Sequence, residues 1–319
     1  VTPTAAGTWY LHIKGYNGAH VGNGNYDYAV TVNKKSVTGT FTAANKVYDG
    51  TPTATVLTRG LNGLVFSDVV TLDGGAANFA DRHVGTGKTV TLSGASLGGA
   101  KAGNYELGSV GTTTANITAK ALTVTGLTAS AKVYDGTTDA TLGGTAAFQE
   151  TELPGAGSTD DGKPYTVDSI AIGGSAAGAF ADRHVGTAKS VTVSGVTVTG
   201  NHRGNYTVTQ PTGLTANITA KALTVTGLTA GSKVYDATTA VSLSGTAALL
   251  GAEAPGTGTT SDGKPYTGDT VSVGGGAAGS VGDRNVGSNK AVTVTGCTLS
   301  GAQAGNYTVT QPTGLTANI

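Results

Sequence analysis

Short runs of alternating apolar and polar residues recur along the chain, and they predict β-strands. Residues 122–125 (LTVT), 190–193 (SVTV) and 206–209 (YTVT) each carry an apolar side chain at every second position. Because successive side chains of a strand point to opposite faces, this alternation predicts one buried face and one solvated face. The pattern is typical of a β-sandwich and not of a parallel sheet buried on both faces. No stretch of the sequence keeps a helical period.

Four motifs return in the same order along the chain. Their positions are KVYDGT at 46–51 and 132–137, with KVYDAT at 233–238; DRHVG at 81–85 and 182–186, with DRNVG at 283–287; GNY at 103–105, 204–206 and 305–307; and ANI at 115–117, 216–218 and 317–319. Self-similarity of this length indicates tandem domains.

The copies differ by one insertion. Matched motifs of the second and third copies are 101 residues apart, whereas Tyr48 and Tyr134 are only 86 apart, so copies two and three hold 15 additional residues. This stretch includes residues 152–165 and 253–266, and both end in Asp-Gly-Lys-Pro-Tyr. Asp-Gly followed by Pro favours a turn, so we expect a surface excursion. A repeat that accepts such an insertion is a closed domain rather than one coil of a solenoid.

These motifs divide the chain into domains. The predicted domains are repeat 1 at 34–118 (the short form), repeat 2 at 119–218 and repeat 3 at 219–319, preceded by 1–33 as the C-terminal hairpin of an earlier β-domain. In that hairpin we expect two strands around a loop at 15–25. About seven short strands in about 100 residues predict an all-β fold, a tandem series of immunoglobulin-like β-sandwiches. No Gly or Ser interrupts residues 216–223 between two repeats, so we expect stiff joints and an elongated rod.

Composition and charge narrow the function classes. Lys and Arg together number 19 and so do Asp and Glu, so the net charge is zero, which argues against a nucleic-acid partner. No apolar run is long enough to span a bilayer, so we expect no membrane insertion by this segment. Cys297 is the only cysteine and excludes an internal disulfide. Because the chain starts at Val1 and stops on a repeat boundary, we interpret it as part of a longer exported protein.

Together, the KVYDGT motif, the ANIT ending and the ALTVTGLT opening resemble the YDG repeat family over residues 34–319. Members of that family occur in long bacterial surface and secreted proteins, including filamentous-haemagglutinin-like adhesins. The resemblance implies an extracellular location at the bacterial cell surface, immunoglobulin-like architecture and a role in adhesion, and it implies no catalytic residue. Ala237 stands where the other copies have Gly50 and Gly136, which argues against a need for positive φ there, since alanine rarely tolerates it.

We interpret the repeated polar and aromatic residues as structural. They are Lys46, Tyr48, Asp49, Asp81, Arg82, Asn104, Tyr105 and Asn116 in repeat 1; Lys132, Tyr134, Asp135, Asp182, Arg183, Asn205, Tyr206 and Asn217 in repeat 2; and Lys233, Tyr235, Asp236, Asp283, Arg284, Asn306, Tyr307 and Asn318 in repeat 3. A tyrosine of this kind packs in a core with its hydroxyl bonded, and an aspartate before Gly-Thr caps a turn. We expect the Asp-Arg pair to fix a loop, and pairing with a charged partner is the alternative. Ligand stacking on the motif tyrosines is the alternative.

A covalent role is a second alternative for these residues. An isopeptide crosslink needs a lysine amine, an asparagine or aspartate carbonyl group and a buried acid. Each repeat offers one residue of each kind. The sets are Lys46, Asn116 and Asp81 in repeat 1; Lys132, Asn217 and Asp182 in repeat 2; and Lys233, Asn318 and Asp283 in repeat 3.

No catalytic, cofactor or metal site is predicted. The sequence lacks EF-hand spacing, and its five histidines form no pair at a metal-binding spacing. Residues 94–98 (GASLG) match a nucleophile elbow, but that motif requires a following helix, which the pattern does not predict.

We therefore expect a non-enzymatic stalk of a bacterial adhesin, in which neighbouring repeats of the same chain contact one another. The alternative is that the insertions of repeats 2 and 3 bind a host or matrix glycan or protein. The candidate contact residues for that alternative are Asp161, Lys163, Tyr165, Asp262, Lys264 and Tyr266. A glycan hydrolase with two facing carboxylates is the third hypothesis, and the small number of acidic residues disfavours it.

Overall fold

The structure of the protein is a computed structural model that describes residues 7–13 and 26–319. The predicted loop at 15–25 lies outside the described residues. Regular structure in the described residues consists of β-strands and three single-turn 3-10 helices, without an α-helix, so the all-β prediction is confirmed. Within the same part of the chain, no helix has the length and apolar character needed to cross a membrane.

The chain opens on a hairpin. Strand β1 (Gly7–Ile13) pairs antiparallel with β2 (Tyr26–Val32), with Gly7 opposite Val32. The two predicted strands are therefore present.

Repeat 1 consists of seven strands in two sheets. The elements are β3 (Lys35–Ala43), β4 (Lys46–Val47), β5 (Val56–Asn62), β6 (Thr71–Phe79), β7 (Gly85–Gly98), η1 (Ala102–Asn104), β8 (Tyr105–Val110) and β9 (Thr113–Thr118). One sheet has the strand order β5-β3-β8 and the other β4-β9-β7-β6. In β3 the buried positions alternate with exposed ones, as the sequence pattern predicts. However, β3 pairs parallel with β8 and β4 pairs parallel with β9, so each sheet is mixed.

Repeat 2 repeats this plan. The elements are β10 (Lys120–Ala129), β11 (Lys132–Val133), β12 (Asp139–Ala140), β13 (Leu142–Phe148), β14 (Ala171–Phe180), β15 (Gly186–Thr199), η2 (Arg203–Asn205), β16 (Tyr206–Thr209) and β17 (Leu214–Thr219). The strand orders are β13-β10-β16 and β11-β17-β15-β14-β12. The pairs β10–β16 and β11–β17 are again parallel.

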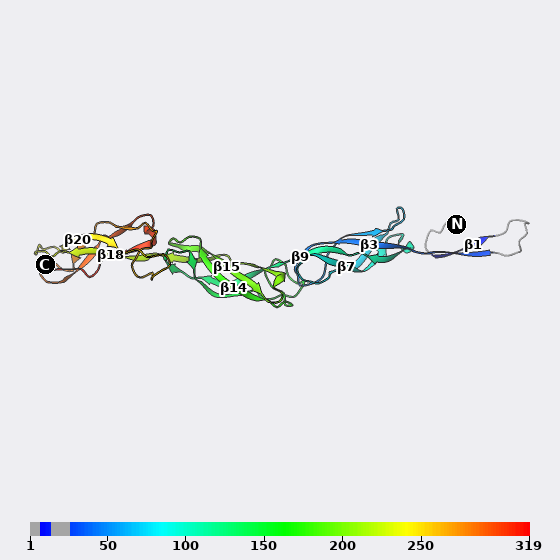
Figure 1. The fold of residues 1–319 in the computed structure, drawn as a ribbon, viewed down its shortest axis with the longest axis horizontal. Coiled ribbons are helices and arrows are strands. Elements are labelled where there is room, and N and C mark those ends of the chain that lie inside the picture. The colour runs from blue at the N-terminus through cyan, green and yellow to red at the C-terminus, as the bar shows by residue number, and fades with distance from the viewer. Residues whose placement is uncertain (1–6, 14–25) are drawn as a thin grey trace, which may run out of the picture. The chain divides into compact units, whose positions relative to one another are not determined.

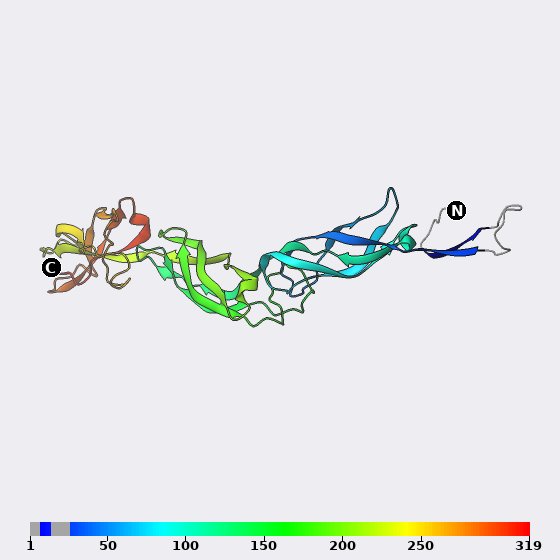
Figure 2. The ribbon, with the colours of Figure 1, turned by 45° about the vertical axis from the view of Figure 1, so that its right-hand side comes forward.

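Repeat 3 has the same central strands and a shorter second sheet. The elements are β18 (Lys221–Ala230), β19 (Ala240–Val241), β20 (Leu243–Leu249), β21 (Ser272–Gly274), β22 (Ala278–Val281), β23 (Lys290–Thr295), β24 (Thr298–Ser300), η3 (Ala304–Asn306), β25 (Tyr307–Thr310) and β26 (Thr316–Ala317). The strand orders are β20-β18-β25, β19-β22-β23-β26 and β21-β24. Figure 1 shows β18 and β20 side by side in this repeat, and in Figure 2 the sheets of the repeats twist and curl.

The chain packs as two compact units that do not coincide with the repeats. The first comprises residues 1–123, 148–173 and 197–209, and the second comprises 124–147, 174–196 and 210–319.

Each unit has a core that joins two successive repeats. In the first unit, Tyr48 and Ile117 of repeat 1 pack in one cluster with Leu122 and Tyr165 of repeat 2. In the second unit, the corresponding cluster joins residues of repeats 2 and 3 and includes Tyr134, Ile218, Leu223 and Tyr266. Side chains of one repeat therefore complete the core of the repeat before it.

Candidate functional site

The lysine and the aspartate of the KVYDGT motif hold a turn within their own repeat. Lys46 Nζ donates to Asp49 Oδ1 and to the carbonyl oxygen of Thr51, both at 2.7 Å. Asp49 Oδ1 also accepts from the Thr51 N–H at 2.9 Å, which forms an Asx turn. The same contacts occur in repeats 2 and 3 at Lys132, Asp135 and Thr137 and at Lys233, Asp236 and Thr238. The polar atoms of this turn are therefore used inside the repeat.

The tyrosine of the motif, in contrast, is buried against the next repeat. Tyr48 has no exposed surface, and its hydroxyl donates to Asp168 Oδ2 at 2.7 Å. The Tyr206 hydroxyl donates to the same oxygen at 2.6 Å. The rings of Tyr165 and Tyr206 meet the Tyr48 ring edge-on, with centroids 5.7 and 5.4 Å away, which is a favourable aromatic geometry.

An arginine of repeat 1 neutralises the carboxylate at the centre of this joint. Arg82 Nη2 lies 3.0 Å from Asp168 Oδ1, as an ion pair without an aligned hydrogen bond, and the Asp168 side chain is fully buried. Burial, together with the hydrogen bond to Asp168, raises the pKa of Tyr48 and of Tyr206 far above the ordinary value. Both phenols therefore stay protonated and keep donating to Asp168.

The joint between repeats 2 and 3 has the same construction. The Tyr134 and Tyr307 hydroxyls donate to Asp269 Oδ2 at 2.7 and 2.6 Å. Arg183 Nη2 lies 2.8 Å from Asp269 Oδ1, and the Tyr266 ring meets the Tyr134 ring edge-on at 5.8 Å. We call Asp168 and the four side chains around it, those of Tyr48, Arg82, Tyr165 and Tyr206, the first joint. The second joint is Asp269 with Tyr134, Arg183, Tyr266 and Tyr307.

The two residues of the Asp-Arg motif have different roles: the aspartate binds within its own loop, and the arginine contacts the joint. Asp81 Oδ1 accepts from the His83 N–H at 2.8 Å and from Lys88 Nζ at 2.7 Å, so the aspartate fixes its own loop. These hydrogen bonds hold the pKa of Asp81 below its usual value. Asp182 and Asp283 make the same contacts in repeats 2 and 3. The arginine beside the aspartate extends to the next repeat and pairs there with a carboxylate, which is the alternative that the sequence left open.

The GNY motif contacts the preceding repeat. Asn205 is buried, and its Oδ1 accepts from the Val84 N–H of repeat 1 at 3.2 Å. Asn306 Oδ1 accepts from the Val185 N–H of repeat 2 at 3.1 Å. The DRHV segment of one repeat and the GNY segment of the next therefore meet at both joints.

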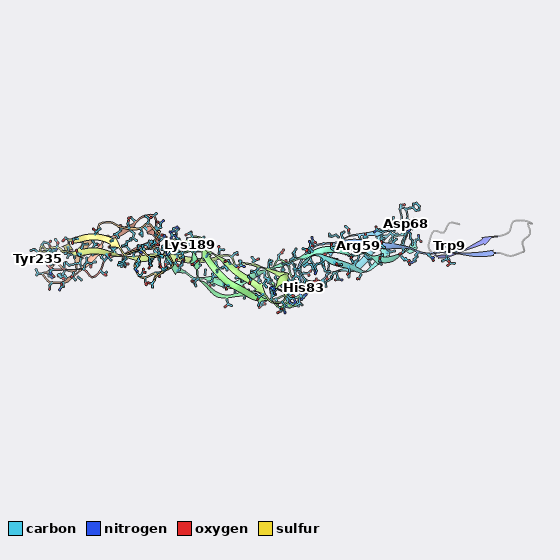
Figure 3. The ribbon with its side chains drawn as sticks, viewed as in Figure 1. Trp9, Arg59, Asp68, His83, Lys189 and Tyr235 are labelled. Carbon is cyan, nitrogen blue, oxygen red and sulfur yellow. The ribbon has the colours of Figure 1, made fainter. Side chains whose placement is uncertain are left out.

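In repeat 1, the corresponding face is formed without a preceding YDG repeat. Tyr105 donates to Asp68 Oδ2 at 2.7 Å and accepts from the Val65 N–H at 3.1 Å. Figure 3 shows Asp68 and His83 at opposite ends of repeat 1, so each repeat has one joint face at each end.

The last face in the chain, in repeat 3, is exposed. Tyr235, which matches Tyr48 and Tyr134, is 50% exposed, whereas both of those are fully buried. Arg284, which matches Arg82, is exposed as well.

The hypothesis of a crosslink between the motif lysine and the last-strand asparagine is wrong. Asn116 Oδ1 accepts from the Gly87 N–H at 2.8 Å, while Lys46 and Asp81 are bound to the other partners described above. Asn217 and Asn318 likewise accept from the backbone N–H groups of Ala188 and Asn289, at 2.8 and 2.7 Å. These asparagines bind backbone, and their side chains do not meet the motif lysines.

The insertion of repeats 2 and 3 is a surface excursion over part of its length, as expected, but its last residues and its contacts with the preceding repeat make it a part of the joint as well. Tyr165 and Tyr266 are each 1% exposed, so a ligand cannot stack on them. The Gly155 N–H donates to the Asp49 carbonyl oxygen at 2.8 Å, and the Gly256 N–H does the same to Asp135. The two lysines among the proposed ligand residues differ in solvent exposure: Lys163 is half-buried and Lys264 is exposed.

This packing explains the glycine of the motif and corrects its interpretation. Gly50 and Gly136 both have φ of +77°, and Ala237 keeps the left-handed backbone at +62°. A Cβ on Gly50 would lie 2.9 Å from Pro154 Cβ of the next repeat, and one on Gly136 would lie 2.9 Å from Pro255 Cβ. Positive φ is thus common to all three copies, and the argument from Ala237 against it is wrong.

Gly136→Ala is therefore expected to destabilise the second joint by about 2 kcal/mol, from left-handed strain together with the clash against Pro255. Ala237→Gly, in the same compact unit, is the matched control and should change stability by no more than about 1 kcal/mol. Denaturant unfolding of both variants measures the difference. A loss for Gly136→Ala no larger than the effect of Ala237→Gly would contradict the role of the proline contact.

A buried lysine begins the first strand of repeats 2 and 3, and sequence reasoning missed it. Lys120 has no exposed surface, and its Nζ lies 2.5 Å from Glu152 Oε1 and 2.9 Å from Asp161 Oδ1. The amine also lies 4.2 Å from the centroid of the Tyr165 ring. We call Lys120, Glu152 and Asp161 the lysine cluster of repeat 2.

Repeat 3 contains the same cluster, and repeat 1 does not. Lys221 Nζ lies 2.7 Å from Glu253 Oε1 and 3.0 Å from Asp262 Oδ1, and Lys221 is fully buried. Lys35 occupies the equivalent strand position, opposite Tyr105, but it is exposed because repeat 1 lacks the insertion that supplies the acids. The sequence did contain a signal for the buried lysine, because Lys35, Lys120 and Lys221 each begin the first strand of a repeat.

The contacts within the lysine cluster shift the pKa values of its own members. Burial alone would lower the pKa of Lys120, but the hydrogen bonds to Glu152 and Asp161 outweigh it and raise the pKa above its usual value. Although burial opposes ionisation of Asp161, the hydrogen bonds from Lys120 and the Lys163 N–H lower its pKa to about 2. The pKa of Asp262 is likewise lowered to about 2.

Acid is therefore expected to weaken the fold through these aspartates. While Asp161 is a free carboxylate, its folded pKa lies below the unfolded value of 3.8, so its contribution to stability is present above that value and disappears as the pH falls toward 2. Urea unfolding at about pH 5 and about pH 2 measures the loss. The double variant Asp161→Asn and Asp262→Asn should depend less on pH over this range, and an unchanged pH dependence would contradict the assignment.

Two histidines that are far apart in sequence meet at the first joint. The rings of His83 and His202 are stacked, with centroids 5.7 Å apart and an interplanar angle of 7°. His202 Nδ1 accepts from the Ser169 N–H at 2.9 Å. Among the residues that the structure describes, no group of three or more His, Cys, Asp or Glu side chains is arranged to hold a metal ion.

Comparison with known proteins gives one family. The family model of the YDG domain matches three successive segments, residues 32–115, 118–213 and 219–314, which together cover most of the chain. No curated protein and no solved structure matches the chain. Each matched segment contains one motif tyrosine, one Asp-Arg pair and one GNY motif.

Proposed function

Because the chain belongs to the YDG domain family, with three tandem copies of the domain, we propose that it is a non-enzymatic stalk in a large bacterial surface adhesin. In this proposal the repeats project an adhesive region away from the cell, and the protein is extracellular. Each repeat is an immunoglobulin-like sandwich, and the array is rod-like. The two-sheet arrangement of repeats 1 and 2 supports the sandwich assignment.

The observation that carries the proposal is the use of the repeated motif. Tyr48 and Arg82 of one repeat and Tyr206 of the next all converge on the buried Asp168, and the second joint repeats this set. The recurrent tyrosine, arginine and GNY residues are thus used to hold one repeat against the next, while the recurrent lysines and aspartates of the motifs hold turns within their own repeat. A ligand-binding repeat would instead leave its recurrent side chains accessible.

The physical consequence of such a joint is a fixed orientation. A carboxylate without exposed surface, bonded to two phenols and paired with a guanidinium, is satisfied in one arrangement only. Bending the joint would expose these groups to solvent or leave them buried without hydrogen-bond partners, which costs free energy. Orientation that is fixed at each joint is what a projecting stalk requires.

Small-angle X-ray scattering of residues 34–319 tests the proposal. A stalk predicts a narrow distribution of long intramolecular distances that changes little with temperature below unfolding. The matched comparison is the variant Tyr48→Ala and Tyr134→Ala, which should broaden that distribution. Wild-type scattering described by freely jointed domains would refute the stalk.

Direct binding of a host or matrix glycan or protein is the competing function. Leu153, in the insertion of repeat 2, is 68% exposed and favours such a contact. Binding of the wild-type chain to host cells or matrix proteins, lost in Leu153→Ser but retained in the exposed control Leu57→Ser, would replace the stalk proposal.

A further inference from the structure

We propose that the buried lysine of repeats 2 and 3 is joined to the aspartate beside it by a self-formed isopeptide bond. The neighbouring glutamate moves the protons. The residues are Lys120, Asp161 and Glu152 in repeat 2 and Lys221, Asp262 and Glu253 in repeat 3. The inference concerns covalent structure and does not depend on the proposed function.

Distance and burial place the reacting groups together. Lys120 Nζ is 2.9 Å from Asp161 Oδ1, and the lysine side chain has no exposed surface. Holding an amine against a carboxyl group raises its effective concentration by many orders of magnitude over the intermolecular reaction. Burial of the amine favours condensation, because it disfavours the charged ammonium, although the Asp161 side chain keeps 22% of its surface exposed.

The glycine beside the cluster positions both carboxyl groups. Gly157 has φ of +70°, and a Cβ there would lie 2.2 Å from Glu152 Oε2 and 3.0 Å from Asp161 Oδ2. Gly258 has the same relation to Glu253 and Asp262, at 2.2 and 3.0 Å. The absence of a side chain at these glycines therefore leaves the space that the second oxygen of each acid occupies. At rest the lysine is an ammonium and the aspartate a carboxylate, and the reactive form arises when one proton passes from the amine to the adjacent carboxyl pair.

The condensation balances without an outside reagent. The Lys120 ammonium passes one proton to the carboxyl pair, and the neutral amine attacks Cγ of the protonated Asp161. The N–C bond forms, the C–OH bond breaks, and the hydroxyl leaves as water with a second amine proton that Glu152 relays. One ammonium and one carboxylate become one amide and one water.

A backbone donor supports the intermediate. The Lys163 N–H donates to Asp161 Oδ1 at 3.0 Å, and the Lys264 N–H donates to Asp262 Oδ1 at the same distance. An amide donor fixed on this oxygen stabilises the negative charge that develops there during attack. The Tyr165 ring faces the amine from 4.2 Å and keeps that side of the cluster apolar.

Repeat 1 is an internal control. Lys35 lies at the same strand position but is exposed, and the short repeat lacks the insertion with its two acids. We therefore infer one bond in repeat 2, one in repeat 3 and none in repeat 1.

Mass spectrometry of the intact chain under denaturing conditions tests the inference. The expected mass is lower than the calculated mass by two waters. Proteolysis should release a linked pair of peptides that contain Lys120 and Asp161, and a second pair that contains Lys221 and Asp262. The calculated mass, or a deficit that maps to other residues, would overturn the proposal, and this measurement on the wild-type chain needs no variant to fold.

Two variants test the role of the glutamates. The double variant Glu152→Gln and Glu253→Gln retains the shape of the acid but cannot relay a proton, so it should recover the full calculated mass. Lys35→Arg, the control in repeat 1, should keep the deficit of two waters. A deficit of two waters in the glutamine variant would refute the glutamates as the proton relay.

Discussion

Asp168→Ala is expected to lower the free energy of unfolding of the first compact unit by about 3–5 kcal/mol. The Asp168 side chain is fully buried and holds the hydroxyls of Tyr48 and Tyr206 together with the Arg82 guanidinium. Removing it leaves two buried donors without an acceptor and one cation without its partner. Denaturant unfolding followed by tyrosine circular dichroism, with hydrogen exchange to locate the loss, measures the effect.

Asp68→Ala is the matched control. Asp68 is the equivalent residue of repeat 1, and it accepts from Tyr105 at 2.7 Å without a tyrosine or an arginine from a preceding YDG repeat. Its loss should cost about 1 kcal/mol, as expected for a single hydrogen bond. Equal losses for the two variants would show that the partners from repeat 1 contribute nothing to the joint.

The strands were predictable because their signal is local. The YTVT pattern at 206–209 coincides with β16, and the pattern at 190–193 lies within β15. Strand pairing was not predictable from the same signal, since alternation shows which face is buried and not which strand lies beside it. The parallel pairs of β3 with β8 and of β10 with β16 join strands from opposite ends of a repeat.

The candidate site was predictable in its residue types and not in its partners. A core tyrosine with a bonded hydroxyl was expected from the KVYDGT motif, but the acceptor of Tyr48 lies 120 residues further along the chain. A signal did exist, because an aspartate recurs at positions 68, 168 and 269, at nearly the spacing of the repeats. It was missed because its neighbours differ in each copy.

The insertion was misinterpreted for a related reason. Asp-Gly and Pro predict a turn correctly, and an isolated turn is usually exposed. In this chain the beginning of the insertion lies against the preceding repeat, where Pro154 packs on Gly50, and Tyr165 at its end enters the core. Local turn chemistry does not reveal whether a second domain covers the turn.

The buried lysine leads to the other large effect. Lys120→Met is expected to destabilise the first compact unit by about 3–5 kcal/mol, because it leaves Glu152 and Asp161 side by side without either the ammonium or the amide bond that Lys120 supplies. Methionine preserves most of the volume of the lysine side chain, so lost packing contributes little. The loss is measured as a shift of the denaturant midpoint at neutral pH.

Lys35→Met separates this effect from a general cost of changing the first strand. Lys35 has the same register in repeat 1 but an exposed side chain, so its replacement should change stability by no more than about 0.5 kcal/mol. If Lys120→Met costs as little as Lys35→Met, the two acids do not depend on the lysine. A large difference would assign the extra stability to the lysine cluster that the insertion completes in repeats 2 and 3.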